Sequence, residues 1–249
     1  ELRDNDERYF GKGTLKAVNN VNTIIRESLI GKEVEEQKTI DSIMLKLDGT
    51  QNKSNLGANA ILAVSVAALK AAALDNNLEL YRYLNKREVH IPFCMFNILN
   101  GGKHASNNVD IQEFMIVPKF DTFKECLRAA SEVFHSLKGI LLDKGLNTNV
   151  GDEGGYAPDL DSNEEALSII VKSIETAGYI PGKNVFIALD VAASSFYNKE
   201  SDTYNIDNTN KTREELLEFY IELVKKYPII SIEDPFDEED YDGFKMITD

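Results

Sequence analysis

VFIALD, residues 185–190, is the stretch that decides the fold. It is a short, almost wholly apolar run that ends in an acid, Asp190. A run of this kind is typical of a strand buried on both faces, and such strands belong to parallel sheets that helices cover. IISIED, residues 229–234, repeats the pattern and ends in Glu233 and Asp234. The two runs therefore predict two strands of one sheet.

Helical patterns separate the predicted strands. Residues 123–142 are amphipathic, and Ser162 with Glu165 and Thr212 with Glu215 have the spacing of capping boxes that begin two more helices. Strands that alternate with helices indicate βα units, either in a barrel or in an open doubly wound sheet. The sequence contains neither GxGxxG nor GxxxxGK[ST], which counts against the nucleotide-binding versions of this architecture.

The first 85 residues have a different pattern, which predicts helices. The segments 14–31 and 36–49 have apolar residues at helical spacing, and the alanine-rich segment 57–74 predicts a buried structural helix. The apolar positions on which the first two helices are predicted are Leu15, Val18, Ile25, Leu29, Ile40, Ile43 and Leu47.

Residues 86–90 are charged and precede a proline, so they mark the predicted domain boundary. We place the two domains at residues 1–88 and 89–249. The chain begins without Met at Glu1 and stops at Asp249 within a helical pattern. We therefore expect it to be a piece of a longer protein.

Composition limits the partners of the protein. The 249 residues carry a net charge of −15, which argues against binding to nucleic acid or to an anionic membrane surface. We see no apolar run of membrane-spanning length. The only cysteines, Cys94 and Cys126, lie in apolar patterns and predict buried thiols in a reducing compartment, the cytoplasm. An anionic ligand would need a cation at its site.

Asp190 and Glu233 end successive predicted strands. In a parallel barrel the carboxyl ends of the strands carry the catalytic groups, so these acids point to a common centre. Several carboxylates at one centre repel each other unless a cation joins them, and hard oxygen ligands suit Mg²⁺. The alternative is that each acid only caps the helix that follows its strand.

Three further segments carry candidate polar groups. Gln112 and Glu113 lie in a strand-like run, where the alternative is a glutamate that faces solvent. His104 lies in the glycine-bearing loop 100–108, which is either an ordinary connection or a mobile loop that reaches a ligand. NVGDEGGYAP, residues 149–158, holds Glu153 among three glycines in a loop that cannot pack a core.

Five segments in chain order closely resemble enolases of the bacterial type: NILNGGKHA, VDIQEFMIVP, NVGDEGGYAP, ALDVAASSF and PIISIEDPF. The resemblance extends to ELRDND and KSNLGANAILAVS near the start, and so covers essentially the whole chain. It implies an α/β fold: the helical part of an α+β N-terminal cap domain, followed by the first half of a (β/α)8 barrel. Residues 92–100 and 109–118 would be its first strands, paired antiparallel.

The resemblance also implies a reaction, the reversible dehydration of 2-phosphoglycerate to phosphoenolpyruvate in glycolysis, with Mg²⁺ as cofactor. Glu153 would be the proton donor and Glu113 its partner near the substrate hydroxyl. His104, Gln112, Glu113 and Glu233 would contact the substrate, and Asp190 and Glu233 would bind the metal. When full length, the protein is expected to form a homodimer or a larger homo-oligomer.

The resemblance further implies that the catalytic lysine, a third metal-binding aspartate and the lid loop lie outside these 249 residues. The chain by itself is then expected to be inactive, and a purely structural or interaction role is the alternative function. Another enolase-superfamily enzyme with a different acid and base is a further alternative. NGGKHA and GDEGG count against it, because they belong to the substrate side of enolase itself.

Overall fold

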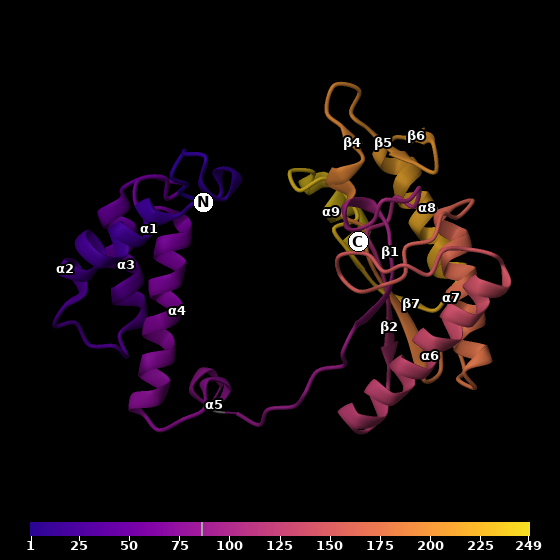
Figure 1. The fold of residues 1–249 in the computed structure, drawn as a ribbon, viewed down its shortest axis with the longest axis horizontal. Coiled ribbons are helices and arrows are strands. Elements are labelled where there is room, and N and C mark those ends of the chain that lie inside the picture. Colours follow the sequence, from indigo (N-terminus) through magenta and orange to yellow (C-terminus); the bar gives the residue numbers. More distant parts are fainter. Residues whose placement is uncertain (86) are drawn as a thin grey trace. The chain divides into compact units, whose positions relative to one another are not determined.

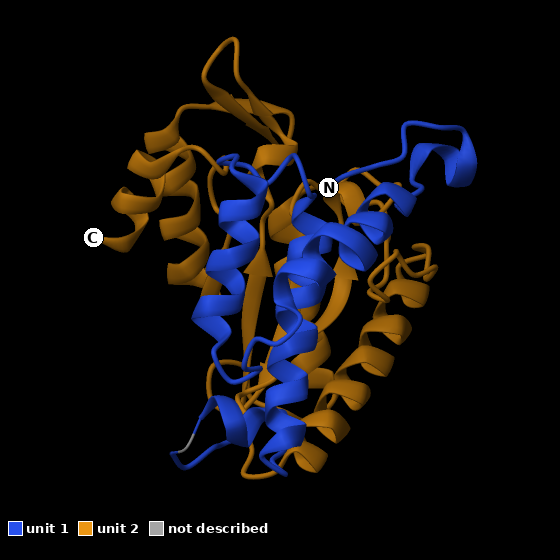
Figure 2. Ribbon diagram, turned by 90° about the vertical axis from the view of Figure 1, so that its left-hand side faces the viewer, with its two compact units in different colours: residues 1–90 blue, residues 91–249 orange. Residues whose placement is uncertain are grey.

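The computed structural model describes residues 1–85 and 87–249. These residues form two compact units, Glu1–His90 and Ile91–Asp249, which Figure 2 shows in different colours. The predicted boundary segment begins at Lys86, which lies outside the described residues.

Unit 1 is helical, as the apolar spacing of its sequence predicts (Figure 1). A continuous helical stretch ends just before Gly31, whose φ of +78° suits glycine. Gly49 ends the next helix in the same left-handed conformation. The elements of unit 1 are η1 (Arg8–Gly11), α1 (Leu15–Asn20), η2 (Val21–Ile25), α2 (Arg26–Leu29), α3 (Gln37–Asp48), α4 (Ala58–Asp75) and α5 (Leu80–Leu84).

The core of unit 1 uses partly different positions from those on which the helices were predicted. Helix α3 buries Ile40, Met44 and Asp48, four residues apart, where the pattern predicted Ile40, Ile43 and Leu47. Asp48 is buried because its carboxylate accepts hydrogen bonds from the backbone N–H groups of Thr50 and Leu56. In α1, Leu15 and Val18 are exposed and Ala17 is buried instead.

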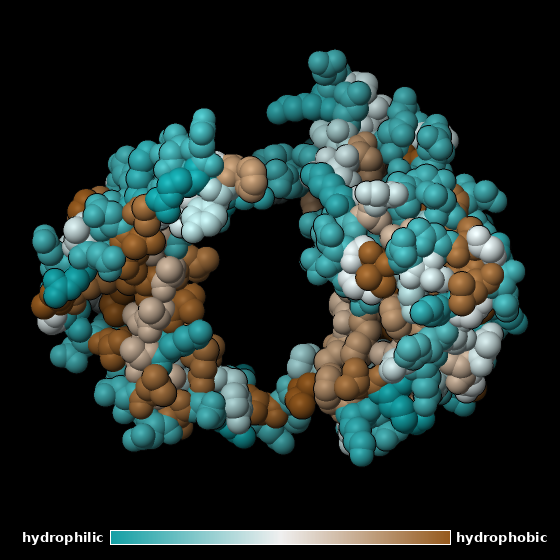
Figure 3. All heavy atoms as spheres, viewed as in Figure 1, coloured by the Kyte–Doolittle hydropathy of each residue, from teal (hydrophilic) through white to brown (hydrophobic). Residues whose placement is uncertain are grey.

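Helix α4 is less buried than predicted. Only Ala60, Ile61, Ala72 and Ala73 are buried, and apolar side chains that include Leu62 and Leu74 are exposed. Figure 3 shows such apolar side chains on the surface of unit 1. With 18 residues, α4 is also long and apolar enough to cross a membrane by length and composition alone, contrary to the sequence-based expectation. A core helix of a globular protein can have the same length and composition.

Unit 2 contains a four-stranded sheet in the order β1-β2-β3-β7 (Figure 1). Strand β2 pairs antiparallel with both β1 and β3, and β3 pairs parallel with β7. The first two strands are therefore antiparallel, as the family resemblance implied. Within the described residues the sheet does not close, which is consistent with part of a barrel. Its strands are β1 (Phe96–Asn100), β2 (Glu113–Pro118), β3 (Val185–Asp190) and β7 (Ile229–Glu233).

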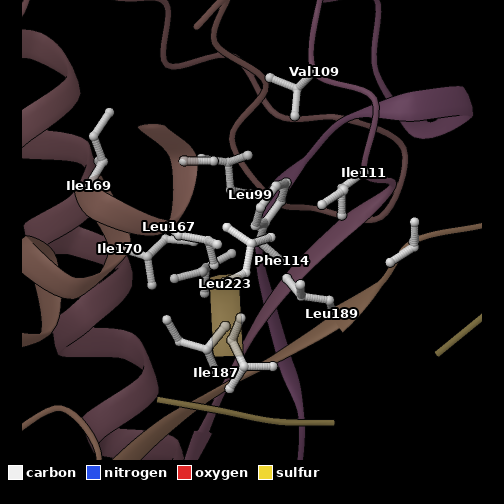
Figure 4. Close-up of a cluster of buried hydrophobic side chains, with 14 of the residues drawn as sticks. Leu99, Val109, Ile111, Phe114, Leu167, Ile169, Ile170, Ile187, Leu189 and Leu223 are labelled. Carbon is white, nitrogen blue, oxygen red and sulfur yellow. The ribbon is translucent and has the colours of Figure 1, made fainter. Parts of the chain in front are cut away.

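The two faces of this sheet bury different clusters. On one face Leu99, Phe114 and Ile187 point toward Leu167 and Ile170 of α7 (Figure 4). The other face carries a smaller apolar cluster, which is Met115, Val117 and Ala188 with Phe186 packed against it. Apolar residues on both faces explain why the strand sequences do not alternate with polar ones.

Helices and a small second sheet complete unit 2. Thr212 and Glu215 form the predicted capping box of α8. At α7 only half of the predicted box forms, because Glu165 accepts its hydrogen bond from the N–H of Asp161 and not from Ser162. These elements are η3 (Gly102–His104), α6 (Phe123–Asp143), α7 (Asn163–Thr176), η4 (Ala193–Ser195), β4 (Tyr197–Asn198), β5 (Thr203–Ile206), β6 (Thr209–Lys211), α8 (Arg213–Lys226) and α9 (Tyr241–Thr248).

Candidate active site

One cross-strand row of polar residues ends the main sheet. Asn100 pairs with Glu113, Glu113 with Asp190, and Asp190 with Glu233 in the registers of the three strand pairs. Residues directly opposite each other on neighbouring strands point to the same face, with Cβ atoms about 4.5–5.5 Å apart. The register therefore gathers three of the predicted site carboxylates, which are far apart in the sequence, on one face of one end of the sheet.

The chain turns sharply after two of these acids. Ala192, two residues after Asp190, has a φ of +46°, and Asp234, directly after Glu233, has a φ of +45°. Such a conformation is uncommon for residues other than glycine and recurs at functional sites. Asp190 holds its own turn, because its Oδ1 accepts a hydrogen bond of 3.1 Å from the N–H of Ala192. Asp190 therefore stabilises the turn after its strand but does not cap the following helix η4, whose N-cap residue is Ala192 and has no side-chain cap hydrogen bond.

Gln112 forms a hydrogen bond with the other carboxylate oxygen of Asp190. Its Nε2 donates to Oδ2 of Asp190 over 3.3 Å. Burial raises the pKa of Asp190, although the hydrogen bonds from Gln112 and from the N–H of Ala192 oppose that shift. This hydrogen bond places Gln112, which directly precedes β2 in the chain, beside the row.

The Glu113 carboxyl lies in a strongly negative environment. Burial raises its pKa, the charge of Asp190 raises it further, and Glu153 and Glu233 add to the shift. His104 counters it, because its Nδ1 lies 3.3 Å from Oε1 of Glu113, although the two atoms are not aligned for a hydrogen bond. Among the ion pairs of the described residues, none joins a lysine or arginine to these four carboxylates.

The loop with His104 is held close to the turn that carries Glu153. The N–H of Asp152 donates to the carbonyl oxygen of His104 over 3.0 Å. Gly101 lets the loop fold tightly, because a Cβ atom there would lie 2.5 Å from the carbonyl oxygens of Val109 and Ile111. A cavity of about 280 Å³ opens between the loop and the turn, lined by Lys103, His104, Ala105, Ser106, Asn147, Asn149, Val150, Gly151, Asp152 and Ala157.

Glu153 lies on an exposed turn, close enough for its charge to contribute to the raised pKa of Glu113. The N–H of Gly151 donates to the carbonyl oxygen of Gly155 over 2.8 Å and closes the turn. Tyr156, the next residue, is joined to β1 by hydrogen bonds with the backbone of Ile98 and Asn100. The turn is therefore fixed to the strand that carries the first member of the row.

Two of the polar groups fit a hard metal ion. Asp190 and Glu233 offer carboxylate oxygens from adjacent strands, which is the chemistry that Mg²⁺ prefers when water and substrate complete its ligands. No three His, Cys, Asp or Glu side chains of the described residues gather closely enough to hold a metal by themselves. The two residues therefore offer oxygen ligands of the kind that Mg²⁺ prefers, but the described residues form no complete metal site.

Asn100 is the member of the row that the sequence did not reveal as a site residue. It is fully buried at the end of β1, opposite Glu113. The available signal was its position, since it is the last residue of a strand-like run and directly precedes Gly101 and Gly102.

A row of carboxylates at the strand ends of part of a barrel defines the class of this protein: an α/β barrel enzyme with an acidic centre. Residues 88–249 match the family described as "Enolase, C-terminal TIM barrel domain", and residues 1–84 match "Enolase, N-terminal domain". The chain therefore belongs to the enolase family of lyases.

Proposed function

We propose that the full-length protein catalyses the Mg²⁺-dependent, reversible dehydration of 2-phosphoglycerate to phosphoenolpyruvate, as a glycolytic enzyme of the cytoplasm. The observation that carries the proposal is the row Glu113–Asp190–Glu233. Three carboxylates lie on one face there, and no lysine or arginine of the described residues forms an ion pair with any of them, in a member of the enolase family. Such a site favours a divalent cation, and an anionic ligand can then bind to that cation.

Asp190 and Glu233 would hold the ion. When bound, Mg²⁺ would stabilise the negative charge that develops on the substrate carboxylate as the neighbouring carbon loses its proton. Gln112 would keep one Asp190 oxygen oriented through its 3.3 Å hydrogen bond. Glu233, which is exposed at the end of its strand, would also contact the substrate.

Glu153 would donate the proton that converts the departing hydroxyl group to water. The charge of Glu153 contributes to the raised pKa of Glu113, and closely spaced carboxyls favour a shared proton. A proton held by this pair of carboxyls is what general acid catalysis requires. His104 and Glu113 would position the substrate between the loop and the turn.

The 249-residue chain by itself is expected to lack this activity. Among its described residues, no lysine forms an ion pair with the row, and no three acids gather closely enough to hold a metal. If the family's base and third metal ligand lie outside these residues, as the resemblance implies, proton abstraction has no agent, and removal of one member of a concerted site costs orders of magnitude in rate. An interaction or structural role is the alternative for this chain.

The proposal is tested by following phosphoenolpyruvate formation by its ultraviolet absorbance, with the full-length protein, 2-phosphoglycerate and Mg²⁺. Turnover that disappears with EDTA and returns with added Mg²⁺ supports the proposal. A folded full-length protein without turnover overturns it. Parallel measurement on the 249-residue chain, combined with sizing chromatography, tests whether that chain is inactive.

A further inference from the structure

The amide of Asn100 is buried without a hydrogen-bond partner. Its exposed fraction is 0%, and within the described part of the chain neither Nδ2 nor Oδ1 is paired. Asn97, earlier in β1, and His104, in the loop that follows the strand, also have buried side-chain atoms without a hydrogen-bond partner. A buried unpaired amide lowers stability, and a native protein that retains one at a site needs a reason for it.

The side chain of Asn100 fills the space beside Gly151 and Gly155, which we call the neck of the turn that carries Glu153. A Cβ atom on Gly155 would lie 2.5 Å from Oδ1 of Asn100, and one on Gly151 would lie 3.2 Å from its Cγ. Gly151 and Gly155 are the two residues whose backbone hydrogen bond closes the turn. Their lack of side chains makes room for the amide, which packs against both.

The same residue lies opposite Glu113 in the row. Its backbone N–H donates to the carbonyl oxygen of Tyr156 over 2.8 Å, directly after the turn. Asn100 is thus the one residue of the row that contacts the turn of Glu153 on one side and has Glu113 as its cross-strand neighbour on the other.

We propose that Asn100 is a positioning residue that sets the spacing between Glu113 and Glu153. An apolar side chain of similar shape could fill the neck of the turn without leaving polar atoms unpaired. A polar one is retained because the space between the two acids receives the oxygen atoms of a hydroxy acid phosphate. This inference rests on the proposed function, from which that ligand follows.

The test uses Asn100→Ala in the full-length protein, with Asn108→Ala as the matched control. Asn108 exchanges two hydrogen bonds with the backbone of Leu160, so its loss loosens the same region without emptying the neck of the turn. For Asn100→Ala we expect kcat to fall about 10²-fold, the cost of misplacing a reacting group by about 1 Å, with a much smaller change in KM. Asn108→Ala should lower the melting temperature and retain most of kcat.

Hydrogen–deuterium exchange of residues 149–158 gives a readout that does not depend on activity. Exchange there should be faster in Asn100→Ala than in the wild-type protein. If Asn100→Ala does not fold, Asn100→Asp keeps the shape. It should leave exchange unchanged, lower kcat and shift the pH–rate profile, because it adds beside Glu113 a titratable carboxyl whose charged form burial disfavours.

The outcomes separate the two proposals. An active wild-type protein in which Asn100→Ala leaves both kcat and exchange unchanged overturns the role of Asn100 alone. If only Asn100→Asp folds, an unchanged kcat together with an unchanged pH–rate profile in that variant overturns the role of Asn100 alone. A wild-type protein without turnover overturns the proposed function, and the catalytic role of Asn100 with it.

Discussion

Asp190 of β3 lies directly opposite Glu233 of β7 in the parallel register. The two carboxylates are therefore on the same face of the sheet, and Asp190 is partly buried there. Like charges in such a place raise each other's free energy unless a cation lies between them. This relationship is the structural basis for our proposal that a magnesium ion binds at the end of the sheet.

Asp190→Asn should weaken Mg²⁺ binding. The amide keeps a hydrogen-bond acceptor for the N–H of Ala192 but removes the negative charge that attracts the ion. Calorimetric titration of the full-length protein with Mg²⁺ measures the effect, and activity should return only partly at high Mg²⁺. Asp121→Asn, at an exposed position before α6, is the control. Unchanged affinity in Asp190→Asn would leave Asp190 with its turn-forming role only.

Glu153→Gln should abolish most of the dehydration while Mg²⁺ and substrate still bind. Glutamine has nearly the same shape but has no proton to donate to the leaving hydroxyl, and general acid catalysis is typically worth about 10²–10⁴-fold in rate. Asp159→Asn, an exposed change in the same connecting segment, should keep normal turnover. A Glu153→Gln protein with more than half of the wild-type rate would contradict the assignment of the proton donor.

Much of this site could be predicted from residue types, but its geometry could not. Asp190 and Glu233 were predicted as neighbours because each ends an apolar run. The register that adds Asn100 to the row depends on long-range pairing, and a one-residue slip would place a different side chain there. Asn100 itself resembles any polar residue at the end of a strand.

The fold, too, has features that local sequence patterns predict and features that depend on long-range contacts. The strands and the capping box at Thr212 follow from local patterns, because apolar runs and cap spacing are local signals. The buried face of α3 could not be predicted from such local signals. Asp48 is buried there through hydrogen bonds to the loop that comes after the helix, and a search for apolar spacing cannot find such a residue.

Asp240 has a consequence for pH dependence. It lies in the acidic run 237–242, a pattern that by itself indicates a solvated helix start, but its side chain is only 7% exposed and pairs with Arg213. Burial alone would raise the pKa of Asp240. The hydrogen bonds from Arg213, the N–H of Gly243 and the hydroxyl of Tyr204 outweigh it and lower the pKa below its ordinary value of 3.8.

A carboxyl whose folded-state pKa is lowered stabilises the protein above its unfolded-state pKa, and this stabilisation is lost as the pH falls through the folded-state value. Asp240→Asn should therefore cost about 1–3 kcal/mol near neutral pH, and the difference from wild type should shrink as the pH falls below 3.8. Urea unfolding of the full-length protein at several pH values measures it. A difference that is independent of pH would show that the Asp240 charge contributes nothing.

Gly155→Ala should reduce both stability and turnover. The new methyl group would lie 2.5 Å from Oδ1 of Asn100 and 2.7 Å from the backbone nitrogen of Leu99, so the turn that carries Glu153 must shift. Gly139→Ala is the matched control, because nothing lies within 4 Å of its new methyl group in α6. There we expect a stabilisation of about 0.5–1 kcal/mol. Thermal unfolding and kcat measured on both variants make the comparison, and equal effects would contradict the packing described for Gly155.

The most direct test of the central claim is the Mg²⁺ dependence of phosphoenolpyruvate formation by the full-length protein, measured side by side for wild type and Glu233→Gln. We predict turnover for the wild type only with Mg²⁺ present, and for Glu233→Gln a rate lower by orders of magnitude that rises only partly at high Mg²⁺. Wild-type turnover that persists in EDTA, or a Glu233→Gln protein with the wild-type rate and Mg²⁺ dependence, would contradict a magnesium site between β3 and β7.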